Sequence, residues 1–319
     1  MSLDPNTTRA NVARFAQRTP LVHDIELSET HESPIHLKLE CLQVTGSFKV
    51  RGAAARMLAL SPEDRRKGVV TCSSGNHGRA VSYVARRLEI PATICVPQWV
   101  DPVKLEAIRS NGAEVILAGA TYDEAEARSM EIHRVEGKVY VHPFDDPFVI
   151  AGQGTISTEI LDDLPTLNRI IVPLSGGGLA AGVARSAKAA HPEVRITAVS
   201  AERANVMVRS LEAGLPIEVA EETTLATALS GGIGIPNQYT FDMVRELIDE
   251  HVSVTENEIL HAMAFALRER SLVVEGGGAV GLAALLAGKL ADRAHAAAAT
   301  AIILSGGNVS LANLADLIA

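Results

Sequence analysis

The feature that most constrains the fold is a regular alternation of short apolar segments with helical segments of about 10 to 15 residues. In the first half of the chain it predicts strands at 69–71, 92–96, 115–117 and 139–141, and helices at 79–88, 102–111 and 122–136. In the second half it predicts strands at 170–173, 194–199 and 300–304, and helices at 156–164, 179–190, 205–213, 256–269 and 279–291. This alternation is typical of βαβ units, so we expect an α/β protein with two lobes. Each lobe should be an open, mostly parallel twisted sheet flanked by helices.

The lobes should differ in size. Residues 1–57 form a mixed lead-in, with a half-buried strand at 35–40 and a helix at 49–59 that ends at Ser61-Pro62. We expect residues 58–145 to form a small, mobile substrate-binding domain. Residues 1–57 and 146–319 should form a large cofactor-binding domain. Residues 215–234 are polar and then rich in glycine, which predicts an irregular segment.

Composition excludes several functional classes. A net charge of −9 argues against a nucleic-acid partner. No apolar run reaches the roughly 18 residues of a membrane helix, and residues 1–20 lack the apolar core of an export signal. Cys41, Cys72 and Cys95 are too far apart for a CxxC metal motif and too few for a disulfide framework. We therefore expect a cytoplasmic protein whose cysteines are small buried apolar residues.

A lysine in an unusual setting is the first candidate for chemistry. Lys49 lies within Thr45-Gly46-Ser47-Phe48-Lys49-Val50-Arg51-Gly52-Ala53, between an aromatic residue and a valine, with small residues on both sides. It could simply be a surface lysine that begins a helix. In a partly dry site, however, burial lowers the pKa of a lysine, which can then act as a Schiff-base nucleophile and as a base.

Four stretches rich in glycine and serine favour the second interpretation. Residues 73–78, 175–178 and 305–308 each follow a predicted strand, and residues 276–278 precede a predicted helix. In open α/β sheets, ligands bind beyond the carboxyl ends of the strands. We therefore expect these stretches to converge on one cleft between the lobes.

Each stretch suits a different chemical group. Ser175-Gly176-Gly177-Gly178 precedes a predicted helix, and the free N–H groups at a helix N-terminus can bind phosphate. The stretch has neither the GxGxxG spacing of dinucleotide-binding sites nor the Lys-Ser/Thr ending of a Walker P-loop. It could also be only a tight turn. Ser73-Ser74-Gly75-Asn76-His77-Gly78 suits a substrate carboxylate, although His77 could instead be structural. Ser305 could bond a heterocyclic nitrogen or cap its turn. Glu275 could be a site residue or a helix cap.

With the lysine and these loops in this order, the sequence resembles pyridoxal-phosphate enzymes of the tryptophan-synthase-β fold type. Within them it resembles the serine/threonine dehydratase and serine racemase family, from Arg18-Thr19-Pro20-Leu21 to Ser305-Gly306-Gly307-Asn308. Residues 46–53 and 74–78 carry the most specific motifs, and Ala151-Gly152-Gln153-Gly154-Thr155 is a further family stretch. Residues 173–184, 230–234 and 274–281 are also similar to hydroxyectoine-utilisation dehydratases, which are thought to act on a hydroxylated diamino acid.

The resemblance implies roles for individual residues. Lys49 would hold pyridoxal 5'-phosphate covalently and later act as the base. The other cofactor-binding residues would be Phe48, Asn76, Gly176, Gly177, Gly178, Leu179, Glu275 and Ser305. The substrate would be bound by residues of one loop, of which Ser74, Gly75 and His77 would hold its carboxylate: Ser73, Ser74, Gly75, Asn76 and His77.

The implied reaction is loss of water from a 3-hydroxy amino acid, of the threonine, serine or hydroxylated diamino acid type, to give a 2-oxo acid and ammonia. A serine facing the pyridine nitrogen cannot keep it protonated as a carboxylate would, which favours prompt loss of the β-hydroxyl. The expected partners are a small amino-acid substrate and a second copy of the chain in a homodimer, with no nucleic acid and no membrane.

Departures from the family pattern leave questions open. Many relatives have Asp-Gly where this chain has Thr227-Ala228. In metal-activated relatives a glutamate and an aspartate six residues later help to bind a divalent ion. Here Glu202 is present but Val208 takes the aspartate position, so one hard ligand is missing. This weakens a Ca²⁺ or Mg²⁺ site without excluding it, and we assign no metal ligands. The sequence also stops soon after Asn308, so we expect no C-terminal regulatory domain of the kind found in feedback-inhibited threonine dehydratases.

Two other functions remain compatible with the sequence. An amino-acid racemase needs a second acid/base group, and Ser74 matches the serine that serves this role in serine racemases, so Ser74 is a second candidate catalytic residue beside Lys49. A non-catalytic binder of pyridoxal phosphate or amino acids could use the same scaffold. Lys49 and Ser305, both intact, argue against such a binder.

Overall fold

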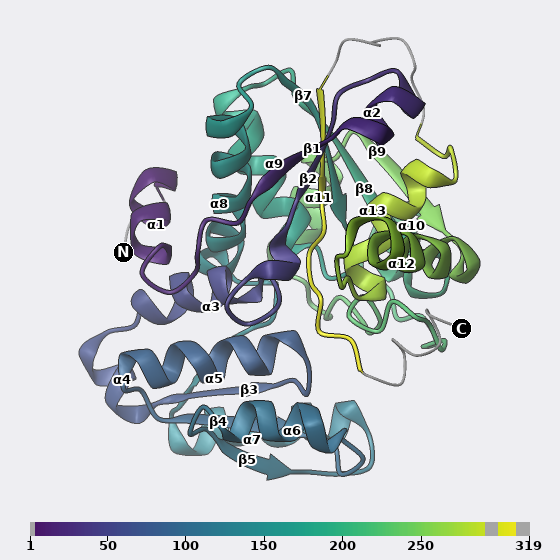
Figure 1. Ribbon diagram of the computed structural model, residues 1–319. Coiled ribbons are helices and arrows are strands. Elements are labelled where there is room, and N and C mark those ends of the chain that lie inside the picture. The colour runs from purple at the N-terminus through teal and green to yellow at the C-terminus, as the bar shows by residue number, and fades with distance from the viewer. Residues whose placement is uncertain (1–3, 291–298, 311–319) are drawn as a thin grey trace. The chain divides into compact units, whose positions relative to one another are not determined.

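The computed structural model describes residues 4–290 and 299–310, which form two compact units (Figure 1). Unit 1 combines the residues up to Gln17 with Lys49–Gly152, and unit 2 combines Arg18–Phe48 with the residues from Gln153 onward. These divisions differ from the expected lobes, 58–145 and 1–57 with 146–319. The difference arises because α1 (Pro5–Val12) packs on α3 (Lys49–Leu58), and α3 packs on α5 (Asn76–Leu88), so all three helices share the core of the smaller sheet.

Unit 1 is built on a four-stranded parallel sheet with the strand order β5-β4-β3-β6. Its strands are β3 (Val69–Cys72), β4 (Ala92–Val96), β5 (Glu114–Leu117) and β6 (Val139–Tyr140). Its further helices are α4 (Pro62–Lys67), α6 (Pro102–Arg109), α7 (Tyr122–Glu136) and the beginning of α8 (Pro147–Asp163).

Both faces of this sheet are covered. Val69 packs in the cluster that contains Val81 of α5, whereas its neighbour Val70 packs with Ile132 of α7. Strands buried on both faces are apolar throughout, which is why the sequence identified β3 and β4 so readily.

Unit 2 is built on a six-stranded sheet with the order β1-β2-β10-β7-β8-β9, parallel except for the pair β1–β2. The strands are β1 (Leu21–Asp24), β2 (Ile35–Lys38), β7 (Leu167–Pro173), β8 (Arg195–Ala201), β9 (Glu250–Val254) and β10 (Ala299–Ile303). The helices besides α8 are α2 (Ile25–His31), η1 (Glu40–Leu42), α9 (Gly178–Ala190), η2 (Glu202–Ala204), α10 (Val206–Ala213), α11 (Thr240–Leu247), α12 (Glu256–Arg270) and α13 (Gly276–Leu286). Figure 1 shows α9 on one side of the sheet and α12 with α13 on the other. The predicted fold class is confirmed.

The core of unit 2 depends on a close approach of α13 to the sheet. A Cβ at Gly281 would lie 3.1 Å from the side chains of both Ile171 in β7 and Ile302 in β10. Leu282, Ala283 and the rest of α13 up to Leu285 are buried as well. The small residues of α13 therefore allow the helix to lie flat on the central strands.

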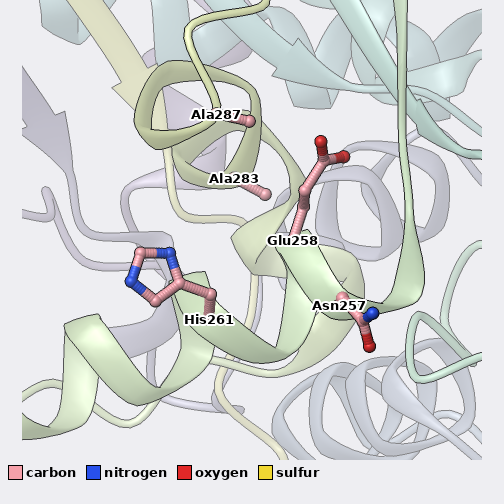
Figure 2. A pocket seen from close by; sticks show the side chains of 5 residues that line it. All are labelled: Asn257, Glu258, His261, Ala283 and Ala287. Atoms are coloured by element: carbon pink, nitrogen blue, oxygen red, sulfur yellow. The ribbon is translucent and has the colours of Figure 1, made fainter.

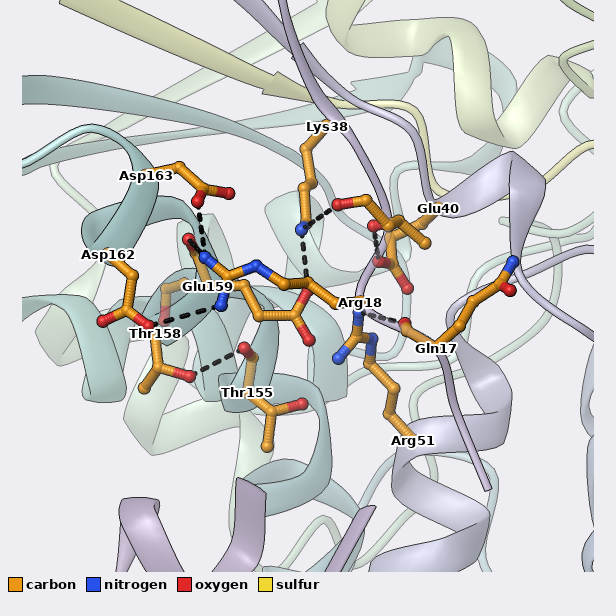
Figure 3. A network of polar contacts seen from close by, with 12 residues as sticks. Gln17, Arg18, Lys38, Glu40, Arg51, Thr155, Thr158, Glu159, Asp162 and Asp163 are labelled. Atoms are coloured by element: carbon orange, nitrogen blue, oxygen red, sulfur yellow. Dashed lines mark hydrogen bonds and ion pairs between the residues drawn. The ribbon is translucent and has the colours of Figure 1, made fainter. Parts of the chain in front are cut away.

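A buried ion pair ties the end of β2 to α8 within unit 2 (Figure 3). Lys38 is fully buried, and its Nζ donates to Glu159 Oε2 at 2.7 Å and to the Thr19 carbonyl oxygen at 2.8 Å. The Thr19 hydroxyl in turn donates to Glu40 at 2.5 Å. Because loss of one partner would leave a buried charge unpaired, this network fixes the path of the chain as it leaves β2.

Several elements begin elsewhere than expected. Helix α8 begins at Pro147 instead of residue 156, α5 at Asn76 instead of 79, and α13 at Gly276 instead of 279. The last helix also ends earlier than expected, at Leu286 instead of residue 291. The sequence also gave no indication of α1, β1, α2, α11 and β9, whereas residues 215–234 are irregular as predicted. Within the described part of the chain, every helix is too short or too polar to cross a lipid bilayer.

Candidate active site

The predicted cofactor residues of unit 2 lie at one edge of its sheet. Strands β2, β10 and β7 are parallel neighbours, so their carboxyl ends meet at the same edge. Residues 175–178 follow β7, residues 305–308 follow β10, and the chain leaves β2 through η1 toward Phe48. This is the edge at which open α/β sheets bind ligands.

The segment that leads to Lys49 is paired with the loop after β10. The Phe48 N–H donates to the Ser305 carbonyl oxygen at 3.1 Å, and the Gly307 N–H donates to the Gly46 carbonyl oxygen at 2.9 Å. Ser47 and Gly306 form an antiparallel bridge. The structure therefore holds Phe48 beside Ser305, a residue that is 4% exposed.

Glu275 belongs to the same group. Its N–H donates to the Gly306 carbonyl oxygen at 3.0 Å, and a Cβ at Gly306 would lie 2.1 Å from Glu275 Oε1. A Cβ at Gly278 would lie 2.6 Å from the Gly306 carbonyl oxygen. Glycine is thus required at positions 306 and 278, because the two loops approach each other at backbone distance.

The predicted phosphate loop is a tight, enclosed turn. Gly177 has a φ of 87° and caps α9, whose first N–H groups have no acceptor within the helix. A Cβ at Gly177 would lie 2.9–3.1 Å from side-chain atoms of Thr240, Met207 and Val244. The Ser175 hydroxyl donates to the Leu229 carbonyl oxygen at 2.8 Å. The loop is therefore held on several sides, with its N–H groups at the edge where the cofactor residues gather.

Unit 1 carries Lys49 and the predicted carboxylate loop. Lys49 is the first residue of α3, and its Nζ donates to the Pro143 carbonyl oxygen at 2.7 Å. Residues 73–78 follow β3, and Pro143 lies shortly after β6, the neighbouring parallel strand. The carboxyl ends of two adjacent strands thus bring Lys49 close to the loop.

The carboxylate loop is closed at its base and open at its tip. A Cβ at Gly78 would lie 2.1 Å from the Ser73 carbonyl oxygen, so only glycine fits there. The Ser73 hydroxyl accepts from the Gly75 N–H at 3.2 Å, and Gly75 precedes Asn76, the first residue of α5. A Cβ at Gly75 would meet nothing within 4 Å. The turn from Ser73 through Ser74 to Gly75 thus presents hydroxyls and helix-start N–H groups on an open side of the unit.

His77 has a structural role in this geometry. It is 4% exposed, and its Nε2 lies 2.9 Å from the Val141 carbonyl oxygen, to which it must donate. Burial, together with the nearby Lys49 ammonium, lowers the pKa of His77 to about 3. Burial likewise lowers the pKa of His142 to about 4. The ring of His77 is therefore neutral and anchors the loop, and only its backbone N–H can contribute to anion binding.

The chain was compared with known proteins and their structures. The sequence model described as "Pyridoxal-phosphate dependent enzyme" matches residues 12–306. The chain belongs to this family. The pyridoxal-phosphate-dependent enzymes that resemble it include a "Putative threonine dehydratase" from Sinorhizobium fredii. That protein is 43% identical over 95% of this chain and 90% of its own length. An "L-threonine ammonia-lyase" from Thermotoga maritima is 41% identical over 99% of this chain and 77% of its own length.

Solved structures of other pyridoxal-phosphate-dependent enzymes have the same fold. Maize serine racemase superposes with a TM-score of 0.92 at 36% identity, covering 98% of this chain and 95% of its own. Threonine deaminase isoform 2 from Solanum lycopersicum superposes with a TM-score of 0.90 at 33% identity, covering 100% and 88%. The cofactor of this chain is therefore pyridoxal 5'-phosphate, as predicted.

The geometry of unit 2 fits this cofactor. A phosphate needs free N–H groups on a backbone that it can approach, and the start of α9 at Gly177 and Gly178 supplies them. The backbone pairing of the 45–48 segment with the 305–307 loop holds Phe48 and Ser305 at the same edge, and an aromatic side chain and a hydroxyl suit a heterocyclic ring.

Sequence reasoning missed residues that act through their backbone. The Pro143 carbonyl oxygen binds Lys49, and the Leu229 carbonyl oxygen anchors the phosphate loop. Carbonyl groups carry no sequence signal, so neither contact could have been predicted. Within residues 4–290 and 299–310, no three His, Cys, Asp or Glu side chains gather in a way that could hold a metal ion.

Proposed function

We propose that this protein is a pyridoxal-phosphate-dependent ammonia-lyase that removes water from a 3-hydroxy amino acid and releases a 2-oxo acid and ammonia. The observation that carries the proposal is the arrangement of Phe48, Ser305 and residues 175–178 at one sheet edge of unit 2. Relatives named for threonine dehydration or ammonia-lyase activity, at 41–43% identity over at least 95% of the chain, support it.

The proposed cofactor site uses residues with different chemistry. Lys49 would bind the cofactor covalently through its amine, and Phe48 would pack against the ring. The N–H groups of Gly176, Gly177, Gly178 and Leu179 would hold the phosphate. Ser305 would face the ring nitrogen, Asn76 the phenolic oxygen, and Glu275 would support the Ser305 loop through Gly306.

The proposed substrate site is the loop 73–77 in unit 1. Ser73, Ser74 and Asn76 offer side-chain donors, and Gly75 and His77 offer backbone N–H groups at the start of α5. The open space at Gly75 allows a carboxylate to approach the backbone. Unit 2 would thus supply the phosphate loop and Ser305, and unit 1 would supply Lys49, Asn76 and the substrate loop. The domain roles expected from the sequence therefore change for Lys49, because the units divide at Phe48–Lys49.

The reaction follows from these groups. When bound, the cofactor draws electrons from the α-carbon of the substrate. The Lys49 amine would act as the base that takes the α-proton. Ser305 offers a neutral hydroxyl and no negative charge, so it cannot hold the ring nitrogen protonated, and this favours early departure of the β-hydroxyl. The β-hydroxyl would take up a proton and leave as water, and the product would be released as an enamine when Lys49 again holds the cofactor. The enamine becomes an imine, and water converts it to the 2-oxo acid and ammonia.

Finer features of the function are also proposals. The similarity of residues 230–234 and 274–281 to hydroxyectoine-utilisation dehydratases suggests a hydroxylated diamino acid as one substrate. A homodimer follows from the family resemblance. A cytoplasmic location is supported by three cysteines that are free and buried, as predicted from the sequence.

Two measurements test the proposal. Incubation with L-serine, L-threonine and L-threo-3-hydroxyaspartate should release 2-oxo acid from at least one of them. Borohydride treatment of the yellow purified protein should fix the cofactor on Lys49, as peptide mass analysis would show. If Lys49→Ala retained full elimination activity and a reducible cofactor linkage, the proposed site would be wrong.

Racemisation is a second candidate function because Ser74 lies in the carboxylate loop and maize serine racemase shares the fold. A racemase needs a second proton donor, and the Ser74 hydroxyl is one. Chiral analysis of the amino acid that remains in the same incubations separates the two functions. D-isomer without 2-oxo acid would favour the racemase, and neither product would favour a non-catalytic binder.

A further inference from the structure

A lysine outside the proposed site joins three elements of unit 2. Lys289 follows α13, and its Nζ donates to Glu258 Oε2 at 2.8 Å and to the Ser253 carbonyl oxygen at 3.0 Å. It also lies 3.9 Å from Glu202 Oε1. These oxygens belong to the first turn of α12, the end of β9 and η2. Two carboxylates and one carbonyl oxygen around a positive charge form the kind of oxygen cage that hard metal cations prefer.

The charge of Lys289 matters to this arrangement. Burial alone would raise the pKa of Glu258, but hydrogen bonds from Lys289 and from the Thr255 N–H outweigh it, and the pKa is lowered. Glu258 also completes the capping box of α12 with Thr255. Without the ammonium, Glu202 and Glu258 would face each other with no intervening positive charge.

The same two elements hold the loop 223–225. In η2, Arg203 donates to the Thr223 carbonyl oxygen at 3.3 Å. In the first turn of α12, the Glu256 carboxylate accepts from the Thr224 hydroxyl and from the Leu225 N–H, both at 2.6 Å. The ligands of Lys289 and the anchors of this loop are therefore close neighbours in sequence: Glu202 precedes Arg203, and Glu256 lies two residues before Glu258.

The loop continues to the proposed phosphate site. Leu225 packs so closely on α13 that a Cβ at Gly276 would lie 2.3 Å from its carbonyl oxygen. Four residues later, the Leu229 carbonyl oxygen accepts from the Ser175 hydroxyl at 2.8 Å. A shift of η2 or of the first turn of α12 would therefore move the anchor of the phosphate loop.

We propose that the Lys289 ammonium occupies a group of oxygen ligands that would otherwise bind a divalent cation. Through these contacts Lys289 positions the phosphate loop without a metal ion. Lys289 is a positioning residue that acts through residues 223–229. Its replacement by a short uncharged side chain should open a site for Ca²⁺. The expected Ca²⁺ binding does not depend on the proposed function. Only the expected effect on cofactor binding rests on it.

One side of Glu258 borders a pocket between α12 and α13. Glu258 lines a pocket of about 180 Å³ together with Asn257, His261, Ala283 and Ala287 (Figure 2). None of the predicted site residues lines this pocket, so a cation entering here would not meet the substrate. A hydrated cation could therefore approach Glu258 once the lysine is shortened.

The test compares Lys289→Ala with Lys289→Arg and with a control, Lys188→Ala. Lys188 donates to a single carboxylate, Asp249, at 2.7 Å in the same unit. Thermal unfolding of each full-length protein is followed without cofactor, with chelator and with Ca²⁺ at about 10 mM, well above the millimolar range of weak sites. Binding of pyridoxal 5'-phosphate is measured under the same conditions.

We expect Lys289→Ala to melt a few degrees lower than the wild type and to bind pyridoxal 5'-phosphate about tenfold more weakly, a change of one 1.4 kcal/mol step. Ca²⁺ should restore both properties in this variant and leave the wild type, Lys289→Arg and Lys188→Ala unchanged. A wild type that responds to Ca²⁺ as strongly as Lys289→Ala, or a Lys289→Ala variant that ignores Ca²⁺, would overturn the proposal. If Ca²⁺ restored the melting temperature of Lys289→Ala but not its affinity for pyridoxal 5'-phosphate, only the effect of Lys289 on the phosphate loop would be rejected.

Discussion

Two strand-to-helix turns of similar composition, Ser73–Gly78 in unit 1 and Ser175–Gly178 in unit 2, are built in different ways. The second is enclosed: Gly177 is surrounded by Thr240, Met207 and Val244, and its φ of 87° excludes most side chains. In the first, a Cβ at Gly75 would meet nothing within 4 Å. A loop that permanently holds a phosphate gains from being preformed. A loop that binds and releases a substrate needs an accessible face, so the difference in packing reflects the difference in proposed ligand.

The largest effect should come from a charge in the enclosed loop. Gly177→Asp adds a side chain where a Cβ would approach Thr240 at 2.9 Å, and it places a carboxylate beside the cofactor phosphate. Strain and like-charge repulsion together should weaken pyridoxal 5'-phosphate binding by ~10³–10⁴-fold. The measurement is cofactor affinity, with circular dichroism to confirm that the protein is folded.

A matched control for that variant is Gly214→Asp. Gly214 has a φ of 77°, and a Cβ there would meet nothing within 4 Å. It therefore shares the backbone strain without the enclosed setting or the neighbouring phosphate. Equal losses of cofactor affinity in both variants would show that strain alone is responsible and would remove the distinction between the loops.

The second effect concerns the side chains of the open loop. Ser74→Ala should lower D-isomer formation by at least ~10²-fold, because racemisation needs a second proton donor, while elimination from an L-substrate is largely kept. Release of 2-oxo acid and chiral composition are measured on the same preparation. If L-elimination falls as far as racemisation, Ser74 is a general substrate ligand and the two-base interpretation fails.

A charge in the open loop should affect the substrate instead of the cofactor. Gly75 occupies the cap of α5 with a φ of −110°, outside the left-handed region, and a Cβ there would meet nothing within 4 Å. Gly75→Asp should raise KM for the amino acid by ~10²-fold through repulsion of its carboxylate. The neutral Gly75→Asn should change KM far less, and cofactor affinity should stay unchanged in both. Loss of cofactor affinity in Gly75→Asp would contradict the assignment of this loop to the substrate.

The smallest effect is a difference in acid sensitivity. The open loop is anchored by a neutral buried histidine, His77, and the enclosed loop by a serine hydroxyl, which does not titrate. The folded-state pKa of His77, about 3, lies below the unfolded value of 6.5. The unfolded state therefore binds more protons between these values. Stability is full above pH 6.5 and is lost as the pH falls toward 3.

At pH 5 this histidine should cost about 2 kcal/mol of stability relative to pH 7. The measurement is denaturant unfolding at both pH values. His77→Gln keeps a donor for the Val141 carbonyl oxygen and should shrink the difference between the two pH values, leaving the contribution of His142. An unchanged difference in His77→Gln would place the acid sensitivity elsewhere.

The sequence was most informative where one pattern governs one element. The apolar strands β3, β4 and β10 were predicted to within one residue and β7 to within three, small errors for a boundary. The loops that follow three of them could be assigned because ligand sites lie at strand ends. Their grouping within each unit agrees with that logic. The domain assignment of Lys49 was wrong, because the sequence placed it in the large domain and the structure places it in unit 1.

Two helices with glycines near their N-termini, α8 and α13, were predicted to begin too late, for one physical reason. Gly152 and Gly154 lower the intrinsic helix propensity of α8, so its start was placed after them. In the structure a Cβ at Gly152 would lie 2.5 Å from the Arg51 carbonyl oxygen, and one at Gly154 would lie 2.7 Å from that of Gly182. These glycines are required by packing against other backbone segments, which sequence patterns do not reveal. The same holds for Gly276 and Gly278 at the start of α13.

The three buried thiols allow transient opening of each unit to be measured by chemical labelling. Burial raises the pKa of Cys41 and Cys95 to about 11 and that of Cys72 to about 12, so almost no thiolate exists at neutral pH. A thiol-specific dye can then label the native protein only when a unit opens transiently. The sequence contains no other cysteine. The labelling rate at Cys72 and Cys95 therefore measures how often unit 1 opens, and the rate at Cys41 measures how often unit 2 opens. Mass spectrometry can measure the labelling rates of the cysteines in the two units with and without substrate. A lower rate in one unit when substrate is present would show that the substrate keeps that unit closed.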